Sequence, residues 1–218
     1  LLVWLGAGGA APVTFNDNVM CVILKSEGEW YEDAHYVSVS DTRPISLKNV
    51  DNKLVGSCLM RAARGVLLRL VVPMQQGCTP GRNCVSNVVA VDAAARVYHA
   101  EYESIKRSAV EEAPAILLFD FSAAFPSLAQ QWAFMSMRWQ GVPAVIVDIL
   151  MLPHVAVFAA LNTECGQEHW LLIASGVLQG CPCSGFIFTI ATVPLLVAVD
   201  DAAHDCGVLL VTASSPHL

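Results

Sequence analysis

A single aspartate, Asp120, interrupts an otherwise apolar stretch, "AILLFDFSAAFPSL" at residues 115–128. A carboxylate in such surroundings is costly to bury unless a cation meets it. Magnesium is one natural partner, because it binds carboxylate and carbonyl oxygens and keeps waters for a phosphate substrate. The alternative is an ordinary carboxylate at the end of a strand, where it caps a loop. The residue types around Asp120 therefore fit either metal-assisted phosphate chemistry or a structural role.

The cysteines offer less chemistry than their number indicates. The chain has 8 cysteines among 218 residues, without a Cys-x-x-Cys pair. Zinc binding by the "CPC" at 181–183 together with His169 is disfavoured, because no histidine stands at the spacing of a zinc finger. A chain this long and this apolar needs no disulfide framework. We therefore expect reduced, buried thiols in an intracellular protein.

The net charge of −7 is unevenly distributed along the chain. Residues 1–42 carry one basic and six acidic groups, residues 43–107 carry ten basic and four acidic groups, and residues 108–218 carry one basic and nine acidic groups. A basic block beside an acidic one suits a protein that binds an anion in one part and a metal in another. A solvated helix face with scattered Arg and Lys is the simpler explanation for part of the basic block.

The elements that must position these residues indicate an α+β fold. We expect an antiparallel sheet with helices packed on one face. Strands are predicted at 18–25, 115–121, 154–162, 169–175 and 206–213, with Arg43 on a further strand or loop before Pro44. Helices are predicted at 50–70, 84–105 (capped by Asn83), 127–140 (capped by Ser127), 143–152 and 184–202.

Four stretches resemble, in order, the motifs of reverse transcriptases of the non-LTR retrotransposon type. "DTRPISLKNVDNKLVG" (41–56) is similar to their Arg-Pro-Ile-Ser-Leu signature, and "QQGCTPGRNCVSNV" (75–88) to the Gln-x-Gly-Phe-x-Pro-Gly-Arg block after it. "FDFSAAFPSL" (119–128) resembles the first catalytic motif, and "GVLQGCPCSGFIF" (176–188) the Gln-Gly-x-Pro-x-Ser turn that follows. The resemblance covers about residues 18 to 212 and implies the fingers and a partial palm of a right-hand polymerase.

This resemblance implies a role for each matching residue in RNA-templated DNA synthesis. Asp120 and the Phe121 carbonyl would hold the two Mg²⁺ ions of nucleotidyl transfer. The incoming dNTP would be bound by Lys25, which precedes the four motifs, and by Arg43, Phe125, Gln179 and Gly180 from three of them. Phosphates of the RNA template and DNA primer would be met by Arg61, Arg64 and Arg82. Under the alternatives, Lys25 is a surface lysine, Phe125 belongs to the core, and the arginines lie on a solvated face.

The chain departs from the pattern most seriously in its last third. Retrotransposon enzymes supply a second metal-binding carboxylate from an aromatic-x-Asp-Asp hairpin. The one Asp-Asp pair, Asp200-Asp201, falls at the predicted end of a helix, too soon after Gln179. We therefore expect a chain truncated before that hairpin and before the thumb, without polymerase activity of its own. The expected domains are an N-terminal edge (1–17), a basic, mostly helical fingers-like part (18–110), a partial palm (111–212) and an aberrant tail (213–218).

Two other functions stay open on the sequence. The first is a non-catalytic nucleic-acid-binding remnant that uses the basic residues of 43–107. The second is a multi-span membrane protein, because residues 169–199 lack Asp, Glu, Lys and Arg over a membrane-spanning length. Gln179, Pro194 and the "QGCPCSG" turn within that stretch favour a buried core. We therefore expect an intracellular protein, nuclear or cytoplasmic, that does not bind a membrane.

Overall fold

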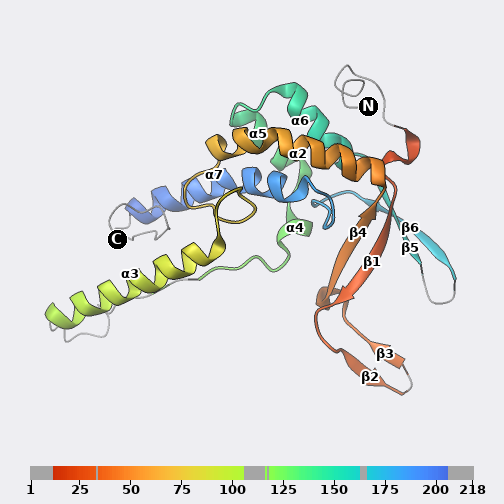
Figure 1. The fold of residues 1–218 in the computed structure, drawn as a ribbon. Coiled ribbons are helices and arrows are strands. Elements are labelled where there is room, and N and C mark those ends of the chain that lie inside the picture. The colour runs from red at the N-terminus through yellow and green to blue at the C-terminus, as the bar shows by residue number, and fades with distance from the viewer. Residues whose placement is uncertain (1–11, 33, 106–115, 117, 163–165, 206–218) are drawn as a thin grey trace. The chain divides into compact units, whose positions relative to one another are not determined.

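The computed structural model describes residues 12–32, 34–105, 116, 118–162 and 166–205. These residues form an α+β fold with helices, a four-stranded sheet and a separate two-stranded hairpin (Figure 1). The strands are β1 (Asn18–Leu24), β2 (Glu29–Tyr31), β3 (Ala34–Tyr36), β4 (Thr42–Lys48), β5 (Val157–Asn162) and β6 (Glu168–Ile173). The α-helices are α2 (Val50–Leu70), α3 (Cys84–Ile105), α4 (Ala124–Ser127), α5 (Gln130–Trp139), α6 (Ala144–Met151) and α7 (Ser184–Asp205). Single 3₁₀ turns are η1 (Val13–Asn16), η2 (Val39–Asp41) and η4 (Leu152–His154).

The four-stranded sheet is mixed, with the strand order β4-β1-β5-β6. The pairs β1–β4 and β5–β6 are antiparallel, whereas β1 and β5 run parallel, with Asn18 opposite Ala159. The prediction of an antiparallel sheet is therefore wrong at its centre. A parallel pair needs a long crossover, and the chain between β1 and β5 supplies one that contains several helices.

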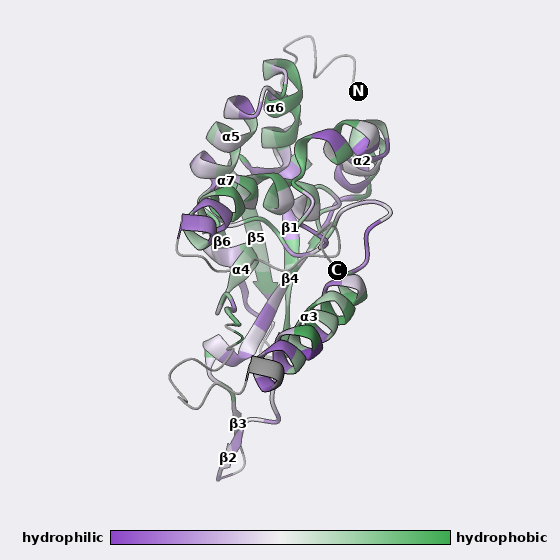
Figure 2. Ribbon diagram, turned by 90° about the vertical axis from the view of Figure 1, so that its left-hand side faces the viewer, coloured by the Kyte–Doolittle hydropathy of each residue, from purple (hydrophilic) through white to green (hydrophobic). Residues whose placement is uncertain are grey.

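The two faces of this sheet differ in their exposure. Directly opposite residues share a face, so the register assigns each side chain to one side. One face is covered, with buried Asn18, Ser46, Lys48, Val157 and Ala159. The other face exposes the apolar side chains of Val19, Leu47, Phe158, Trp170 and Leu172. Helices are expected on the buried face, and which of them pack there stays a prediction; α6 is a strongly apolar helix (Figure 2).

The described chain divides into two units. The first unit is Leu1–Ala63 with Ala123–Phe188, and it contains the whole four-stranded sheet. The second unit is Arg64–Ser122 with Thr189–Leu218. Both units are built from two separate stretches of chain. In the first unit, β1 and β4 pair in one sheet with β5 and β6, which are far away in sequence. The predicted boundary between a fingers-like part and a palm near residue 110 stays a prediction.

Several predicted elements are confirmed within a residue or two. Helices α2 and α3 have the predicted bounds, and the Asn83 Oδ1 accepts a hydrogen bond of 2.9 Å from the Val85 N–H, as expected of a cap. β1 and the β5–β6 pair are also confirmed, although β5 starts three residues later than predicted, and Arg43 lies on the strand β4. The predicted strand at 206–213 lies outside the described residues. The short β2–β3 hairpin, at residues 29–36, falls where no strand was predicted.

Two predictions of local structure are wrong. The predicted buried strand at 115–121 is absent from its described residues, where Leu118 and Phe119 are 85% and 90% exposed. Apolar composition specifies a buried strand only where neighbouring strands pair with it. Ser127 does not cap the next helix, because it lies inside the short α4, and α5 starts after Ala129, which makes no side-chain cap.

Among the described residues, α7 alone is long and apolar enough to cross a membrane. This rests on its length and composition, and the core helix of a soluble protein passes the same test. Its first half contains the buried residues Phe186, Ile187, Ile190 and Ala191. One such helix is weak evidence for a membrane span, so the absence of membrane binding stays a prediction.

Candidate functional site

The loop at residues 174–183 is fastened to strand β4 by its backbone. The Ser46 N–H donates to the Gln179 carbonyl oxygen over 2.7 Å. Gly180 has a φ of +109°, and a Cβ there would overlap the Ser46 carbonyl oxygen. Glycine is therefore required at this position by its conformation and by the close approach of two backbones. The predicted Gln-Gly pair thus lies directly against the predicted Arg-Pro-Ile-Ser strand.

The same loop is fastened on its other side to the segment around α4. The Val177 N–H donates to the Phe125 carbonyl oxygen, and the Gly176 N–H to the Leu128 carbonyl oxygen, each over 3.0 Å. The Gln130 Nε2 donates to the Gly176 carbonyl oxygen over 2.9 Å. Gly176 has a φ of +82°, and a Cβ there would lie 2.8 Å from the Pro126 carbonyl oxygen. The second half of the "FDFSAAFPSL" motif is therefore locked to the Gln179 loop.

These contacts surround a pocket of about 170 Å³ in the first unit. The pocket is mostly apolar, and it accepts one ring or sugar rather than a whole nucleotide, since sites for drug-sized ligands usually measure about 300–1,000 Å³. It is lined by Met20, Pro44, Ser46, Pro126, Ile173, Ser175, Gly176, Val177, Leu178 and Gln179. Three stretches that are distant in sequence thus meet at one concave surface.

Of the predicted nucleotide-binding residues, Phe125, Gln179 and Gly180 come together around this pocket. Gln179 lines it, Gly180 packs against β4, and the half-buried Phe125 ring lies 5.1 Å from the Phe188 ring. Arg43 is exposed on β4, one residue before the pocket-lining Pro44. Since successive side chains of a strand point to opposite faces, Arg43 points away from the face that lines the pocket. The structure therefore brings together three of the predicted residues and directs Arg43 elsewhere.

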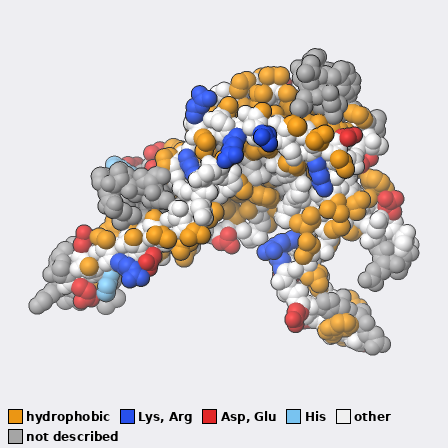
Figure 3. Space-filling model, viewed as in Figure 1, with side chains coloured by type: hydrophobic (Ala, Val, Ile, Leu, Met, Phe, Trp, Pro, Cys, Tyr) orange, Lys and Arg blue, Asp and Glu red, His pale blue; other side chains and the backbone are white. Residues whose placement is uncertain are grey.

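Lys25 and Arg61 are the other predicted cations of the first unit. Lys25 follows β1, and its Nζ donates to the Ser40 carbonyl oxygen over 2.7 Å. This hydrogen bond joins the two ends of the segment between β1 and β4, which contains β2 and β3. Arg61 is exposed on α2. Figure 3 shows Lys and Arg side chains at the surface over α2. Both residues are accessible to a phosphate, and their binding roles stay predictions.

Asp120 and Phe121 belong to the second unit, where they form neither helix nor strand. Both residues are exposed. The two acidic residues Asp200 and Asp201 lie near the end of α7 and are also exposed, as expected of a solvated helix end. The assignment of Asp120 and Phe121 to metal binding stays a prediction.

Arg82 and Arg64 are the predicted phosphate-binding residues of the second unit. The Arg82 guanidinium donates to the carbonyl oxygens of Val72 at 2.5 Å and Gln75 at 2.8 Å, and to those of Val71 and Pro73 at longer range. A cation there also meets the negative end of the α2 dipole. Arg82 thus closes the loop after α2, while Arg64 is exposed on that helix. Phosphate binding stays a prediction for both.

The described residues do not form the magnesium site that the resemblance implies. Among them, no three or more His, Cys, Asp or Glu side chains gather as a metal centre. A two-metal site needs carboxylates that bridge or flank both ions. The described residues therefore do not fit the two-metal arrangement.

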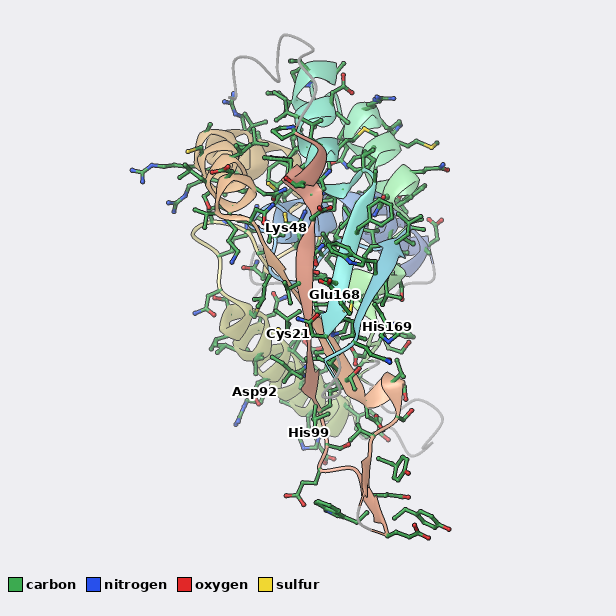
Figure 4. The ribbon with its side chains drawn as sticks, turned by 90° about the vertical axis from the view of Figure 1, so that its right-hand side faces the viewer. Cys21, Lys48, Asp92, His99, Glu168 and His169 are labelled. Atoms are coloured by element: carbon green, nitrogen blue, oxygen red, sulfur yellow. The ribbon has the colours of Figure 1, made fainter. Side chains whose placement is uncertain are left out.

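A buried group of titratable side chains, which the sequence did not reveal, lies behind the Gln179 loop. Lys48 ends β4 (Figure 4) and its Nζ donates to the Pro153 carbonyl oxygen over 2.7 Å. Burial lowers the pKa of Lys48 to about 8, against the opposing influence of Cys181 and Cys183. Burial and the neighbouring Lys48 lower the pKa of His154 to about 4. One signal in the sequence was available, because the alternation of side chains along a strand places Lys48 on the same face as Pro44 and Ser46.

Other residues of the pocket also escaped the sequence analysis. Ser46 and Gly176 are held by backbone contacts rather than by chemistry of their side chains. The signal for them was the run "SGVLQG", where two glycines bracket a turn and both adopt a positive φ. Backbone contacts between distant segments leave no other trace in a single sequence.

The chain is similar to proteins of mobile genetic elements. It is 27% identical over 162 residues to the "Retrovirus-related Pol polyprotein from type-2 retrotransposable element R2DM" of Drosophila melanogaster. It is 23% identical over 158 residues to the "Transposon TX1 uncharacterized 149 kDa protein" of Xenopus laevis. Each alignment covers 72% of this chain but only 14% and 11%, respectively, of the relative. No known protein-family profile matches the chain.

Proposed function

We propose that this chain is the fingers and part of the palm of a reverse transcriptase of the non-LTR retrotransposon type. The observation that carries the proposal is the pocket of the first unit, where β4, the α4 segment and the Gln179 loop meet. Each of these three stretches resembles a different motif of that family, and a polymerase uses such motifs at one nucleotide site. The similarity to two proteins of mobile elements supports the same origin.

In this proposal the pocket receives the sugar or base of an incoming dNTP. Phe125 lies beside the sugar, and Gln179 and Gly180 face the nucleotide and the template. Arg43 points to the other face of β4, so Arg43 and the exposed Lys25 attract the triphosphate at long range, before the sugar or base enters the pocket. Arg61, Arg64 and Arg82 meet phosphates of the RNA template and the DNA primer, which is a sequence-independent role.

The proposed activity of this chain alone is binding without synthesis. RNA-templated DNA synthesis by two Mg²⁺ ions requires carboxylates beyond Asp120, and the described residues do not gather them. Any metal bound through Asp120 and the Phe121 carbonyl therefore needs further ligands before it can activate a primer hydroxyl. The polymerase reaction itself is proposed for the longer proteins that carry this region.

The experiment measures binding and synthesis in the same samples. The full chain is titrated into a fluorescein-labelled RNA–DNA hybrid at several salt concentrations, and then receives dNTPs with magnesium or manganese. We expect binding that weakens steeply with salt, because phosphate contacts release counterions, and no extension of the primer. The R61Q/R64Q variant should bind less tightly, while R96Q serves as the control, because Arg96 is already paired with Asp92 at 2.8 Å. Absence of binding at low salt contradicts the proposal, as does extension that D120A abolishes.

A non-catalytic nucleic-acid-binding role is the second candidate, and the exposed arginines of α2 favour it. The two candidate functions differ in whether the pocket binds a nucleotide, because a protein that only binds nucleic acid makes no use of Gln179. A Q179A variant that binds the hybrid normally but no longer discriminates a matched dNTP supports the polymerase origin. We further propose an intracellular location, nuclear or cytoplasmic, and no membrane partner.

A further inference from the structure

The β2–β3 hairpin is a separate two-stranded sheet that the chain inserts between β1 and β4 (Figure 1). Glu29 lies directly opposite Tyr36 in the antiparallel register, and Tyr31 follows Glu29 by two residues. Directly opposite residues, and residues two apart along a strand, share a face of a sheet. One face of the hairpin therefore carries the side chains of Glu29, Tyr31 and Tyr36, whereas Trp30 points to the other face.

The two tyrosine rings on this face meet at an open angle, which we call the aromatic corner together with Glu29. The ring centroids of Tyr31 and Tyr36 are 6.3 Å apart, and the ring planes are at 72° to each other. Tyr31 is 68% exposed and Tyr36 is 59% exposed, so both rings are open to solvent. A cation is attracted when it lies over the face of an aromatic ring, within about 6 Å of the ring centroid. One cation in the angle between these two rings can therefore interact with both.

The surroundings of the aromatic corner are acidic. Glu29 is exposed, and within the described residues its carboxylate has no hydrogen-bond or ion-pair partner. Residues 27–36 carry four acidic residues and no lysine or arginine. Such a segment attracts cations and repels phosphates. The charge of the hairpin is therefore complementary to a basic polypeptide and opposes the binding of nucleic acid at this place.

We propose that the aromatic corner binds a methylated lysine side chain of a basic polypeptide. Methyl groups replace the N–H donors of the ammonium, so a methylated lysine keeps its charge but is less strongly hydrated than lysine itself. The rings of Tyr31 and Tyr36 contact the methyl groups, and the Glu29 carboxylate supplies the opposite charge. The acidic residues around the corner attract the basic residues beside the methylated lysine. The proposal does not depend on the proposed polymerase origin, because no residue of the pocket takes part.

The test titrates the full chain into a short fluorescein-labelled basic peptide that carries one trimethyllysine, with fluorescence polarisation as the readout. A second peptide replaces the trimethylammonium by a tert-butyl group, which has the same shape without the charge. We expect the trimethyllysine peptide to bind about tenfold more tightly than this neutral peptide, because the rings attract the cation. Equal affinity for the two peptides, or no binding of either at low salt, overturns the proposal. This comparison needs no variant of the protein.

Variants of the chain assign the binding to the aromatic corner. Tyr31→Leu and Tyr36→Leu should each weaken binding of the trimethyllysine peptide about fivefold, whereas Y31F/Y36F keeps both rings and should bind as the parent chain does. Trp170→Leu is the control, because it removes an exposed aromatic side chain from β6 instead. Unchanged binding by both leucine variants overturns the proposal. Binding of phosphatidylcholine vesicles without binding of the peptide also overturns it, because a lipid headgroup carries a similar cation.

Discussion

The two halves of one motif, "FDFSAAFPSL", have opposite fates in this fold. The first half, Phe119 to Phe121, is exposed and forms neither helix nor strand. The second half, around Phe125 and Pro126, is held in α4 by hydrogen bonds to the Gln179 loop. The unit boundary falls between Ser122 and Ala123, between the two halves. The half that would bind metal and the half that would bind the nucleotide therefore belong to different units of the structure.

The difference lies in the partners that each half finds. Residues 125–130 meet a loop whose N–H and carbonyl groups pair with theirs, and two glycines allow the backbones to approach. Residues 118–121 have the composition of a buried strand, but no strand among the described residues pairs with them. Composition makes burial favourable, whereas backbone pairing specifies the position. The pocket is thus fixed by backbone contacts between β4, the α4 segment and the Gln179 loop.

The largest effect is expected for a substitution that separates the loop from β4. Gly180→Ala should lower the free energy of unfolding by about 3 kcal/mol or more, because its Cβ overlaps the Ser46 carbonyl oxygen and its φ is strained. Gly141→Ala is the matched control, since Gly141 also has a positive φ but no atom within 4 Å of its Cβ position. It should cost about 1 kcal/mol. Urea denaturation measures both, and equal losses would contradict the close approach.

The next largest effect is a dependence of stability on pH through His154. The pKa of His154 is about 4 in the folded chain and 6.5 for an unperturbed histidine. As the pH falls, His154 is therefore protonated in the unfolded chain before it is protonated in the folded chain. Stability from this group is complete above pH 6.5 and is lost progressively as the pH falls through 4. The loss amounts to about 3 kcal/mol. Denaturation curves between pH 8 and pH 4 measure it. His154→Leu should flatten this dependence, while His169→Gln, at an exposed position, should leave it unchanged; a slope unchanged by His154→Leu would contradict the assignment.

A smaller effect tests the contact between the α4 segment and the loop. Gln130→Ala removes the hydrogen bond from the Gln130 Nε2 to the Gly176 carbonyl oxygen, and should cost about 1 kcal/mol. Gln131→Ala is the adjacent control at an exposed position, and should stay within about 0.5 kcal/mol of the parent chain. If both variants unfold at the same urea concentration, the loop is not held by this side chain.

The smallest effect is expected in the first half of the motif. Asp120→Asn should change the free energy of unfolding by less than about 0.5 kcal/mol, because the side chain is exposed. Thermal or urea unfolding of the two chains in the same buffer provides the comparison. A decrease of several kcal/mol in the free energy of unfolding would show that Asp120 is a structural residue of the second unit. It would contradict the difference described between the two halves of the motif.

Local order was predictable from the sequence where neighbours along the chain decide it. Asn83 identified the start of α3. The proline at position 44 favours an extended backbone at Arg43, which was predicted on a strand or loop and lies on β4. These signals act over a few residues, and a single sequence contains them in full.

Order that depends on distant segments was not predictable. The parallel pairing of β1 with β5 and the absence of a strand at 118–121 both depend on which strands meet in space. The burial of Lys48 against Pro153 likewise joins residues that are far apart in the chain. Phe125, Gln179 and Gly180 come from two motifs of the resemblance and lie near each other in the fold, while their role in nucleotide binding stays a prediction.

The central claim is that the pocket of the first unit is a nucleotide site. The most direct measurement is photocrosslinking of the full chain to a primed RNA–DNA hybrid that carries a photoreactive thiopyrimidine at the templating position, with peptides mapped by mass spectrometry. We expect crosslinks to the peptides of β4 and of residues 173–180, which a matched dNTP strengthens or protects. Crosslinks that avoid both peptides, and that a matched dNTP leaves unchanged, would contradict it.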